Sequence, residues 1–299
     1  MTQYTAQAAM EKAATPSALR DTRSEFDRMN QQGFKRFRRR AARRGADPAH
    51  VDDDIRINLP ARLPDTWDRL PLRLPGVQKH LRSRAPLISF FRNDPAAKAF
   101  DLLRTRLLQT LRERGWQRVA VTGPTSGCGS TFTAVNLALS LARVPGSRNI
   151  LMDLNQRTPG IADLLDMHDS GQMRRFLCGE AQPAEHLVRI CDTLAVGLTQ
   201  EPDSQSAELL QTANCTVAMA NMVDEINPDV VIYDLPPMLE HDDLAAFLPQ
   251  VDGVLLVSDA TRTTPDHLAA CERILGDRTE LLGVILNRAK RSGVESLGA

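Results

Sequence analysis

The chain has 299 residues, of which 42% are hydrophobic and 25% are charged, so we expect one large or two ordinary domains with a substantial core. No run approaches the roughly 18 apolar residues of a membrane-spanning helix, which excludes an integral membrane protein, and the polar N-terminus has no apolar leader, so cytoplasmic residence is expected. The 5 cysteines show no Cys-x-x-Cys spacing, which argues against a disulfide framework and a zinc site.

The net charge of zero hides a strong asymmetry along the chain. Residues 1–120 hold 25 Lys and Arg against 13 Asp and Glu, whereas residues 121–299 hold 12 against 24. The densest basic stretch runs from Lys35 to Arg44. Such a stretch is either a solvated arm or a contact for a polyanion or an anionic membrane surface.

Three regions are predicted along the chain. Residues 1–90 form a basic arm rich in Pro and Arg, which we expect to be extended and partly disordered because repeated X-Pro steps prevent long helices. Residues 91–290 form the folded domain, which begins with an amphipathic helix from Asp94 to Gly115, and residues 291–299 form a short tail.

Short apolar runs alternate with helical patterns from Arg118 onward. Strands are predicted over residues 118–123, 149–154, 193–199, 229–235, 252–259 and 281–288, and helices over residues 130–143, 171–178, 205–226, 241–248 and 264–275. Apolar strands separated by helical crossovers indicate a doubly wound α/β fold with a mostly parallel sheet. Ligands of such sheets bind at the carboxyl ends of the strands.

The first predicted strand leads directly into a Gly-rich loop and then a helix. This is the order of a phosphate-binding loop, G-x-x-x-x-G-K-[ST], but Ser130 stands at the lysine position. Glycines let a backbone fold closely around an anion, and a helix N-terminus offers free N–H groups and a positive dipole end. The predicted binding residues are Gly127, Cys128, Gly129, Ser130, Thr131 and Phe132; a Gly-rich structural turn is the alternative.

The missing lysine matters physically. Two unit charges about 4 Å apart are worth about 4 kcal/mol at an effective dielectric of 20, so its loss should weaken phosphate binding severely. The chain has no lysine from Ala99 to Ala289. A replacement cation must therefore be an arginine, and Arg157, Arg262 and Arg288 follow predicted strands.

Two aspartates stand where strands end. Asp153 closes the second predicted strand, and Asp234 closes the fourth. A carboxylate in such a place typically holds Mg²⁺ opposite the loop hydroxyl, here Thr131. The position of each Asp alone fits a helix cap or a turn residue as well as it fits a metal ligand. Their occurrence together with the loop predicts a nucleotide and Mg²⁺ site.

The chain from about Asp94 to Arg288 resembles the cytoplasmic kinase domain of bacterial tyrosine kinases. This family of capsular and exopolysaccharide biosynthesis lies within the ParA/MinD group of P-loop ATPases. The resemblance rests on TGPTSGCGSTFTAVNLALSLA, ILMDLNQRTPG, DVVIYDLPP and LLGVILNR. It implies ATP or ADP and Mg²⁺ as cofactors, Asp153 and Asp234 in catalytic positions, Asp243 as a further metal-site carboxylate, and Asn287 and Arg288 near the adenine.

The departures from the family are equally informative. Ser130 replaces the catalytic lysine, Thr125 replaces the additional lysine of ParA-type loops, and Asn155 replaces the second Asp of the second-strand motif. The helix before the loop reads Lys98, Asp101 and Arg104 in place of the family's Glu, Arg and Arg for ring assembly. The C-terminal tyrosine cluster is also missing. These departures predict a pseudoenzyme that supports exopolysaccharide biosynthesis or export and binds nucleotide weakly or not at all.

The resemblance implies a membrane polysaccharide co-polymerase as partner, and leaves homo-oligomers open. Peripheral attachment to the inner membrane face through Lys35 to Arg44 is a further expectation. One alternative is an active ATPase or kinase of the same family that uses an arginine in place of the lysine. A second alternative is a ParA-like protein that positions DNA through the basic arm, although nucleic acid is the weaker expectation.

Overall fold

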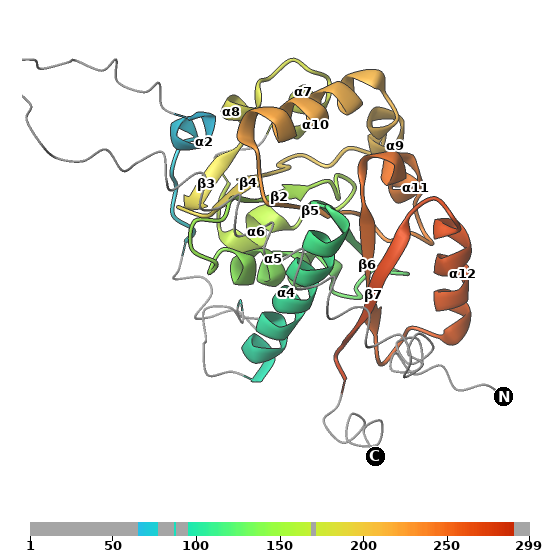
Figure 1. The fold of residues 1–299 in the computed structure, drawn as a ribbon. Helices are drawn as coiled ribbons and strands as arrows, with labels where there is room; N and C mark the ends of the chain where they lie inside the picture. The colour runs from blue at the N-terminus through green and yellow to red at the C-terminus, as the bar shows by residue number, and fades with distance from the viewer. Residues whose placement is uncertain (1–64, 77–86, 88–94, 169–171, 290–299) are drawn as a thin grey trace, which may run out of the picture. The chain divides into compact units, whose positions relative to one another are not determined.

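The computed structural model describes residues 65–76, 87, 95–168 and 172–289, which are coloured in Figure 1. The expectations for the Lys35 to Arg44 stretch and for residues 291–299 lie outside the described residues. No helix in the described ranges is long and apolar enough to cross a membrane.

A seven-stranded sheet lies at the centre, in the order β3-β4-β2-β5-β1-β6-β7. The strands are β1 (Arg118–Thr122), β2 (Asn149–Asp153), β3 (Val188–Cys191), β4 (Leu194–Gly197), β5 (Val230–Asp234), β6 (Gly253–Asp259) and β7 (Glu280–Asn287). Every neighbouring pair is parallel except β3 and β4. This arrangement confirms the predicted doubly wound, mostly parallel α/β fold.

Helices cover both faces of the sheet (Figure 1). They are α2 (Thr66–Arg69), α4 (Pro95–Arg114), α5 (Ser130–Leu141), α6 (Ile161–Leu165), α7 (Met173–Leu177), α8 (Pro183–His186), α9 (Ser206–Leu210), α10 (Ala213–Ile226), α11 (Asp243–Phe247) and α12 (Pro265–Leu275), with the 3₁₀ turn η3 (Leu248–Gln250). Alternate residues of each central strand enter opposite cores, as β-strand geometry requires. Met152 and Tyr233 pack with α7 and α10, whereas Leu151 and Ile232 pack with α4 and α5.

Several elements differ from the sequence prediction, among them the short helices α2, α6 and α8, which were not predicted. The single helix expected over residues 205–226 is divided into α9 and α10, because the hydroxyl of Thr212 accepts a hydrogen bond from the N–H of Cys215 and starts a new helix. Strand β3 was not predicted. It is only four residues long and lies at the sheet edge, so its short pattern gave no periodic signal.

Helix α4 packs on α5 through a charged cluster around Asp101. This carboxylate accepts hydrogen bonds from Arg104, from Arg143 and from the hydroxyl of Ser140 at 2.8 Å. Asp101 and Arg104 occupy two of the positions at which the resembled family carries ring-assembly residues, and in this structure they form hydrogen bonds within the chain. Leu107 and Leu111 of the same helix are buried beneath it.

The segment from Asp65 to Gly76 packs on the edge of the sheet, although it belongs to the part of the chain that the sequence predicted to be extended. Trp67 is buried, and its ring N–H donates to the carbonyl of Asp192 at 3.1 Å. Leu72 forms a parallel bridge with Arg189 of β3. These contacts shield an edge strand that would otherwise expose unpaired backbone groups.

Candidate functional site

The loop between β1 and α5 has the backbone of an anion-binding turn. Gly127 and Gly129 have φ of +81° and +90°, a region that residues with side chains rarely adopt. A Cβ on Gly129 would also lie 2.3 Å from the side-chain nitrogen of Asn287. Helix α5 begins directly after Gly129, so its first N–H groups face the loop without intrahelical partners.

The end of β7 holds the outer side of this loop. The side-chain amide of Asn287 donates to the carbonyl of Cys128 at 2.8 Å, and Arg288 donates to the carbonyl of Gly127 at 2.9 Å. Arg288 also contacts the buried carboxylate of Asp259. Both residues therefore lie against the loop, and their predicted contact with an adenine stays a prediction.

Asp153 and Asp234 end the neighbouring strands β2 and β5 and are paired in register. Both side chains are completely buried. One oxygen of Asp153 accepts a hydrogen bond from the N–H of Ile161 at 3.1 Å. Its other oxygen and both oxygens of Asp234 have no well-formed hydrogen bond among the described residues. Buried carboxylate oxygens left unpaired are costly, so this pair marks a place for a cation or a proton.

Burial shifts the ionisation of both groups. Desolvation raises the pKa of Asp153 to about 7, although backbone N–H groups, that of Ile161 first, oppose the rise. Desolvation also raises the pKa of Asp234 well above its usual range, and the negative charge of Asp153 adds to this effect. The neighbouring Thr131 hydroxyl lowers the pKa of Asp234 in part. The sheet and α5 therefore bring together three of the four predicted metal-site residues, Thr131, Asp153 and Asp234.

This group of oxygens suits Mg²⁺. Magnesium prefers carboxylate and hydroxyl oxygens and usually completes its shell with water and substrate phosphates. Within the described ranges, no three or more His, Cys, Asp or Glu side chains come together as a metal site of their own. Thr131, Asp153 and Asp234 would thus hold the ion only jointly with a phosphate bound in the adjacent loop.

Asp243 is occupied in a different way. It is completely buried, and its two oxygens accept hydrogen bonds from Arg157, at 2.8 Å, and from the hydroxyl of Ser206. The hydrogen bond from Ser206 ties α11 to α9, and the ion pair with Arg157 ties α11 to the segment after β2. Asp243 could bind a metal ion only if Arg157 or Ser206 released its carboxylate. The ion pair with Asp243 also engages Arg157, which is one of the three candidate replacement cations.

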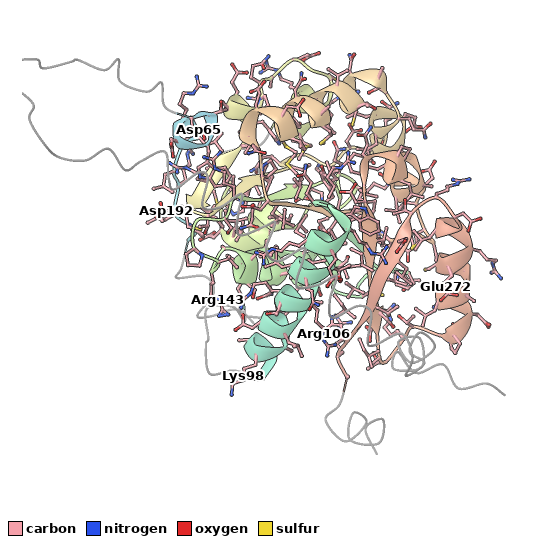
Figure 2. All side chains as sticks on the ribbon, in the orientation of Figure 1. Asp65, Lys98, Arg106, Arg143, Asp192 and Glu272 are labelled. Carbon is pink, nitrogen blue, oxygen red and sulfur yellow. The ribbon has the colours of Figure 1, made fainter. Side chains whose placement is uncertain are left out.

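The position of the lost lysine remains without a nearby ammonium. Lys98 is the sole lysine of the described residues, and Figure 2 shows it at the start of α4. Arg262 lies at the loop itself. If Gly127 carried a Cβ atom, that atom would lie 3.3 Å from a guanidinium nitrogen of Arg262. Arg262 and Arg288 are therefore the candidate cations that the fold brings to the loop.

Sequence reasoning missed Glu240. It follows the Pro-Pro pair after β5, and its carboxylate accepts hydrogen bonds from the N–H of Ser126, at 2.8 Å, and from the Ser126 hydroxyl. The pKa of Glu240 is lowered, first by these two bonds and further by the electrostatic effects of His241 and Arg262. The contact joins residues far apart in sequence, so no local pattern could reveal it.

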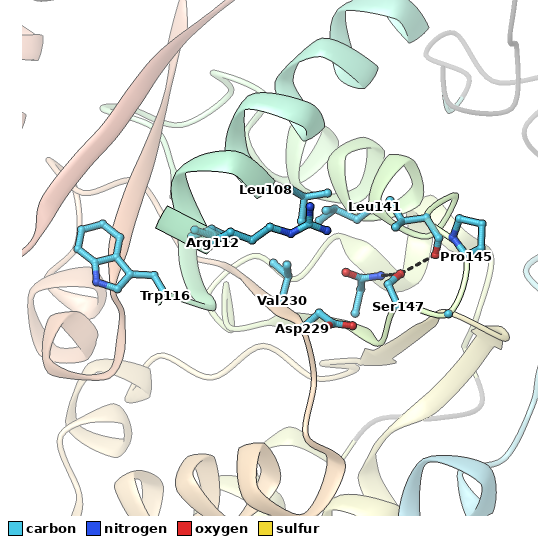
Figure 3. A pocket seen from close by; sticks show the side chains of 12 residues that line it. Leu108, Arg112, Trp116, Leu141, Pro145, Ser147, Asp229 and Val230 are labelled. Carbon is cyan, nitrogen blue, oxygen red and sulfur yellow. Dashed lines mark hydrogen bonds between the residues drawn. The ribbon is translucent and has the colours of Figure 1, made fainter. Parts of the chain in front are cut away.

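A separate hollow of about 200 Å³ lies at the opposite ends of the strands (Figure 3). Leu108, Arg112 and Trp116 line it together with Asp229 and Val230, at the start of β5. Because the Gly-rich loop and the acidic pair lie at the carboxyl ends of the strands, this hollow is not part of the candidate site.

The parallel sheet, the Gly-rich loop after its first strand and the acidic pair at the strand ends define a fold of the P-loop nucleotide-binding type. No family model matches the chain. EpsB of Ralstonia solanacearum, which is named as a tyrosine-protein kinase, is 28% identical over 81% of this chain and 32% of its own length. The chain therefore spans about a third of that relative.

Other comparisons agree with this classification. The succinoglycan biosynthesis transport protein ExoP of Rhizobium meliloti is 32% identical over 54% of this chain and 21% of its own length. The chromosome-partitioning ATPase Soj of Thermus thermophilus is 30% identical over 57% of the chain and 68% of its own length. The kinase domain of Escherichia coli tyrosine kinase ETK matches with a TM-score of 0.61 at 21% identity, over 74% of this chain and 91% of that domain. The chain belongs to the ParA-like family of P-loop proteins that includes the bacterial tyrosine kinases.

Proposed function

We propose that this chain is a catalytically impaired relative of the bacterial tyrosine kinases that supports exopolysaccharide biosynthesis or export. The proposed domain spans residues 91–290, with ATP or ADP and Mg²⁺ as weakly bound or lost cofactors. The observation that carries the proposal is the combination of a Gly-rich loop and the acidic pair Asp153 and Asp234 with a serine at position 130. Ser130 offers a hydroxyl at the position where catalysis of phosphate transfer needs a cation. Preorganised positive charge at a transferring phosphate is a large part of catalysis in such sites.

The tyrosines also argue against kinase activity of the family's kind. Tyr233 is completely buried in β5 and packs edge-to-face on Phe247 at 4.9 Å. Its hydroxyl has no route to a phosphoryl donor while the sheet is intact. Tyr4 lies outside the described residues, and a single residue does not replace a tyrosine cluster.

The biological setting rests on the named relatives. ExoP is named for succinoglycan biosynthesis and transport. We propose a comparable role here, in which this chain acts in the cytoplasm with a membrane polysaccharide co-polymerase as its partner. In this proposal the stretch from Lys35 to Arg44 contacts the anionic inner face of the membrane. Oligomerisation of the chain is part of this proposal.

A second candidate, an active ATPase, is favoured by one observation: Arg262 lies against Gly127, where a guanidinium could contact a phosphate. The two candidates differ in turnover. An active ATPase hydrolyses Mg-ATP, loses this activity in Asp234→Asn and Arg262→Gln, and keeps it in Ser130→Ala. The impaired protein shows no turnover in any of these variants.

Calorimetry of ATP and ADP, with and without Mg²⁺, tests the main proposal. The wild-type protein should bind weakly or undetectably, and Ser130→Lys should bind at least about tenfold more tightly because the charge returns to an intact cradle. Thr105→Lys, which adds the same charge on the exposed face of α4, is the matched control and should change nothing. If Ser130→Lys binds no better than Thr105→Lys, the loop is a structural turn.

Salt-dependent binding of duplex DNA, lost on deletion of residues 35–44, would instead favour the DNA-positioning alternative.

A further inference from the structure

The mouth of the Gly-rich loop already contains an anion that belongs to the chain. Both oxygens of the Glu240 carboxylate are bound by Ser126, one by its backbone N–H at 2.8 Å and the other by its hydroxyl. Backbone N–H groups of such loops are the donors that recognise phosphate oxygens. A carboxylate in this place satisfies a donor that a bound phosphate would otherwise use.

The start of α5 offers further backbone donors beside this contact. Helix α5 has 12 residues, and the N–H groups of its first turn have no intrahelical partners. Next to this helix end, both oxygens of the completely buried Asp234 lack a well-formed hydrogen bond, and the Thr131 hydroxyl lies beside them. This buried carboxylate, with the Thr131 hydroxyl beside it and no well-formed hydrogen bond, points to a cation, and a cation there implies a phosphate at the helix end.

The charge of Glu240 also affects Arg262, one of the two cations at the loop. Arg262, whose guanidinium lies against Gly127, is one of the groups that stabilise the ionised Glu240. An arginine that balances a carboxylate of its own chain is less available to a ligand phosphate. The contact therefore both fills one end of the loop and reduces the positive charge that the ligand encounters.

From this arrangement we propose that Glu240 is a specificity-determining residue that makes the loop select a nucleoside diphosphate over a nucleoside triphosphate. The inference rests on the proposed nucleotide site. The helix end accepts two phosphate groups with their Mg²⁺, whereas a third phosphate would have to displace the Glu240 carboxylate from Ser126 and approach its negative charge.

The test uses Ser130→Lys as a background in which nucleotide binding is measurable, and adds Glu240→Gln, which removes the charge but keeps the shape. ATP should bind about tenfold more tightly after the second change, whereas the affinity for ADP should change less than about threefold. Glu225→Gln, an exposed substitution at the end of α10, is the control and should affect neither nucleotide.

The outcomes separate the two proposals. If Ser130→Lys binds nucleotide and Glu240→Gln changes ATP and ADP affinity equally or not at all, the role of Glu240 is refuted while the nucleotide site stands. If none of the variants binds either nucleotide, the site and the role of Glu240 fall together. A crystal structure of the double variant with ATP should further show the terminal phosphate at the N–H of Ser126, and a terminal phosphate elsewhere would also overturn the inference.

Discussion

The buried carboxylate of Asp153 should make the protein less stable as the pH rises, and Asp153→Asn should remove the part of this pH dependence that Asp153 contributes beside Asp234. The pKa of Asp153 is about 7 in the folded chain, against 3.8 for an ordinary aspartate. Between these values the folded state binds a proton that the unfolded state does not, so the free energy of unfolding falls as the pH rises. At 1.36 kcal/mol per pKa unit, the full penalty above pH 7 is about 4 kcal/mol.

Urea unfolding between pH 4 and pH 8, without divalent cations, measures this effect. Asp153→Asn keeps an oxygen that accepts from the N–H of Ile161 but carries no charge. We expect it to be more stable than the wild type by about 2 to 4 kcal/mol at pH 8, with the difference shrinking toward zero near pH 4. Asp163→Asn, at an exposed position of α6, is the control and should show no such trend.

Magnesium should act in the opposite sense. An ion bound between Asp153 and Asp234 together with a loop-bound phosphate stabilises only the folded state, so Mg²⁺ added with excess ADP should stabilise the wild type and leave Asp153→Asn unchanged. The difference between the two proteins at pH 8 therefore narrows with Mg²⁺. If Asp153→Asn is instead destabilised equally at all pH values, the carboxylate has a satisfied structural role and the reasoning fails.

Three further predictions concern the fold. His186 is buried against Phe176 with its pKa lowered to about 4, so its own contribution to the free energy of unfolding should fall by up to about 3 kcal/mol as the pH falls from 6.5 to 4, opposite in sign to the contribution of Asp153. In urea titrations the stability of the wild type relative to His186→Leu should therefore fall over this range, and a difference that does not change with pH would exclude this contribution. Asp101→Asn should lower the free energy of unfolding by about 1 kcal/mol, because the contact with Arg143 is partly exposed, and a hydrogen-exchange profile unchanged in α4 would count against the cluster. Trp67→Ala should cost about 3 to 5 kcal/mol in thermal unfolding, and a loss below about 1 kcal/mol would mean that the segment from Asp65 to Gly76 contributes little.

The sequence predicted the central sheet because the signal is strong there. Strands β2 and β5 are continuous apolar runs that end in an aspartate, and a parallel sheet buried on both faces requires this pattern. Elements at the periphery were predicted less well. Strand β3 and helix α8 have four residues each, and the start of α10 depends on one hydroxyl of Thr212.

In the candidate site, too, some features were predictable from the sequence and others were not. The approach of Asp153 to Asp234 follows from the rule that parallel strands end on one edge of the sheet, so sequence order was sufficient to predict it. The contacts of Glu240 and Asp243 with Ser126, Arg157 and Ser206 were not predictable, because they depend on how the segment after β5 packs against the segments after β1, β2 and β4. No periodic pattern encodes such contacts between side chains of distant loops.

The acidic pair and the loop lead to one physical argument. A fold selected only for stability would not bury two adjacent carboxylates with three oxygens unpaired, because hydrophobic residues of similar size would fill the space at less cost. Such local conflicts mark functional sites in otherwise consistent structures. Loss of the lysine at Ser130 removes a charge that serves phosphate transfer, whereas Asp153, Asp234 and Thr131 still form a place for a cation. The residues present therefore keep a place for a cation beside the loop and lack the ammonium that the phosphate-binding loop motif carries at this position.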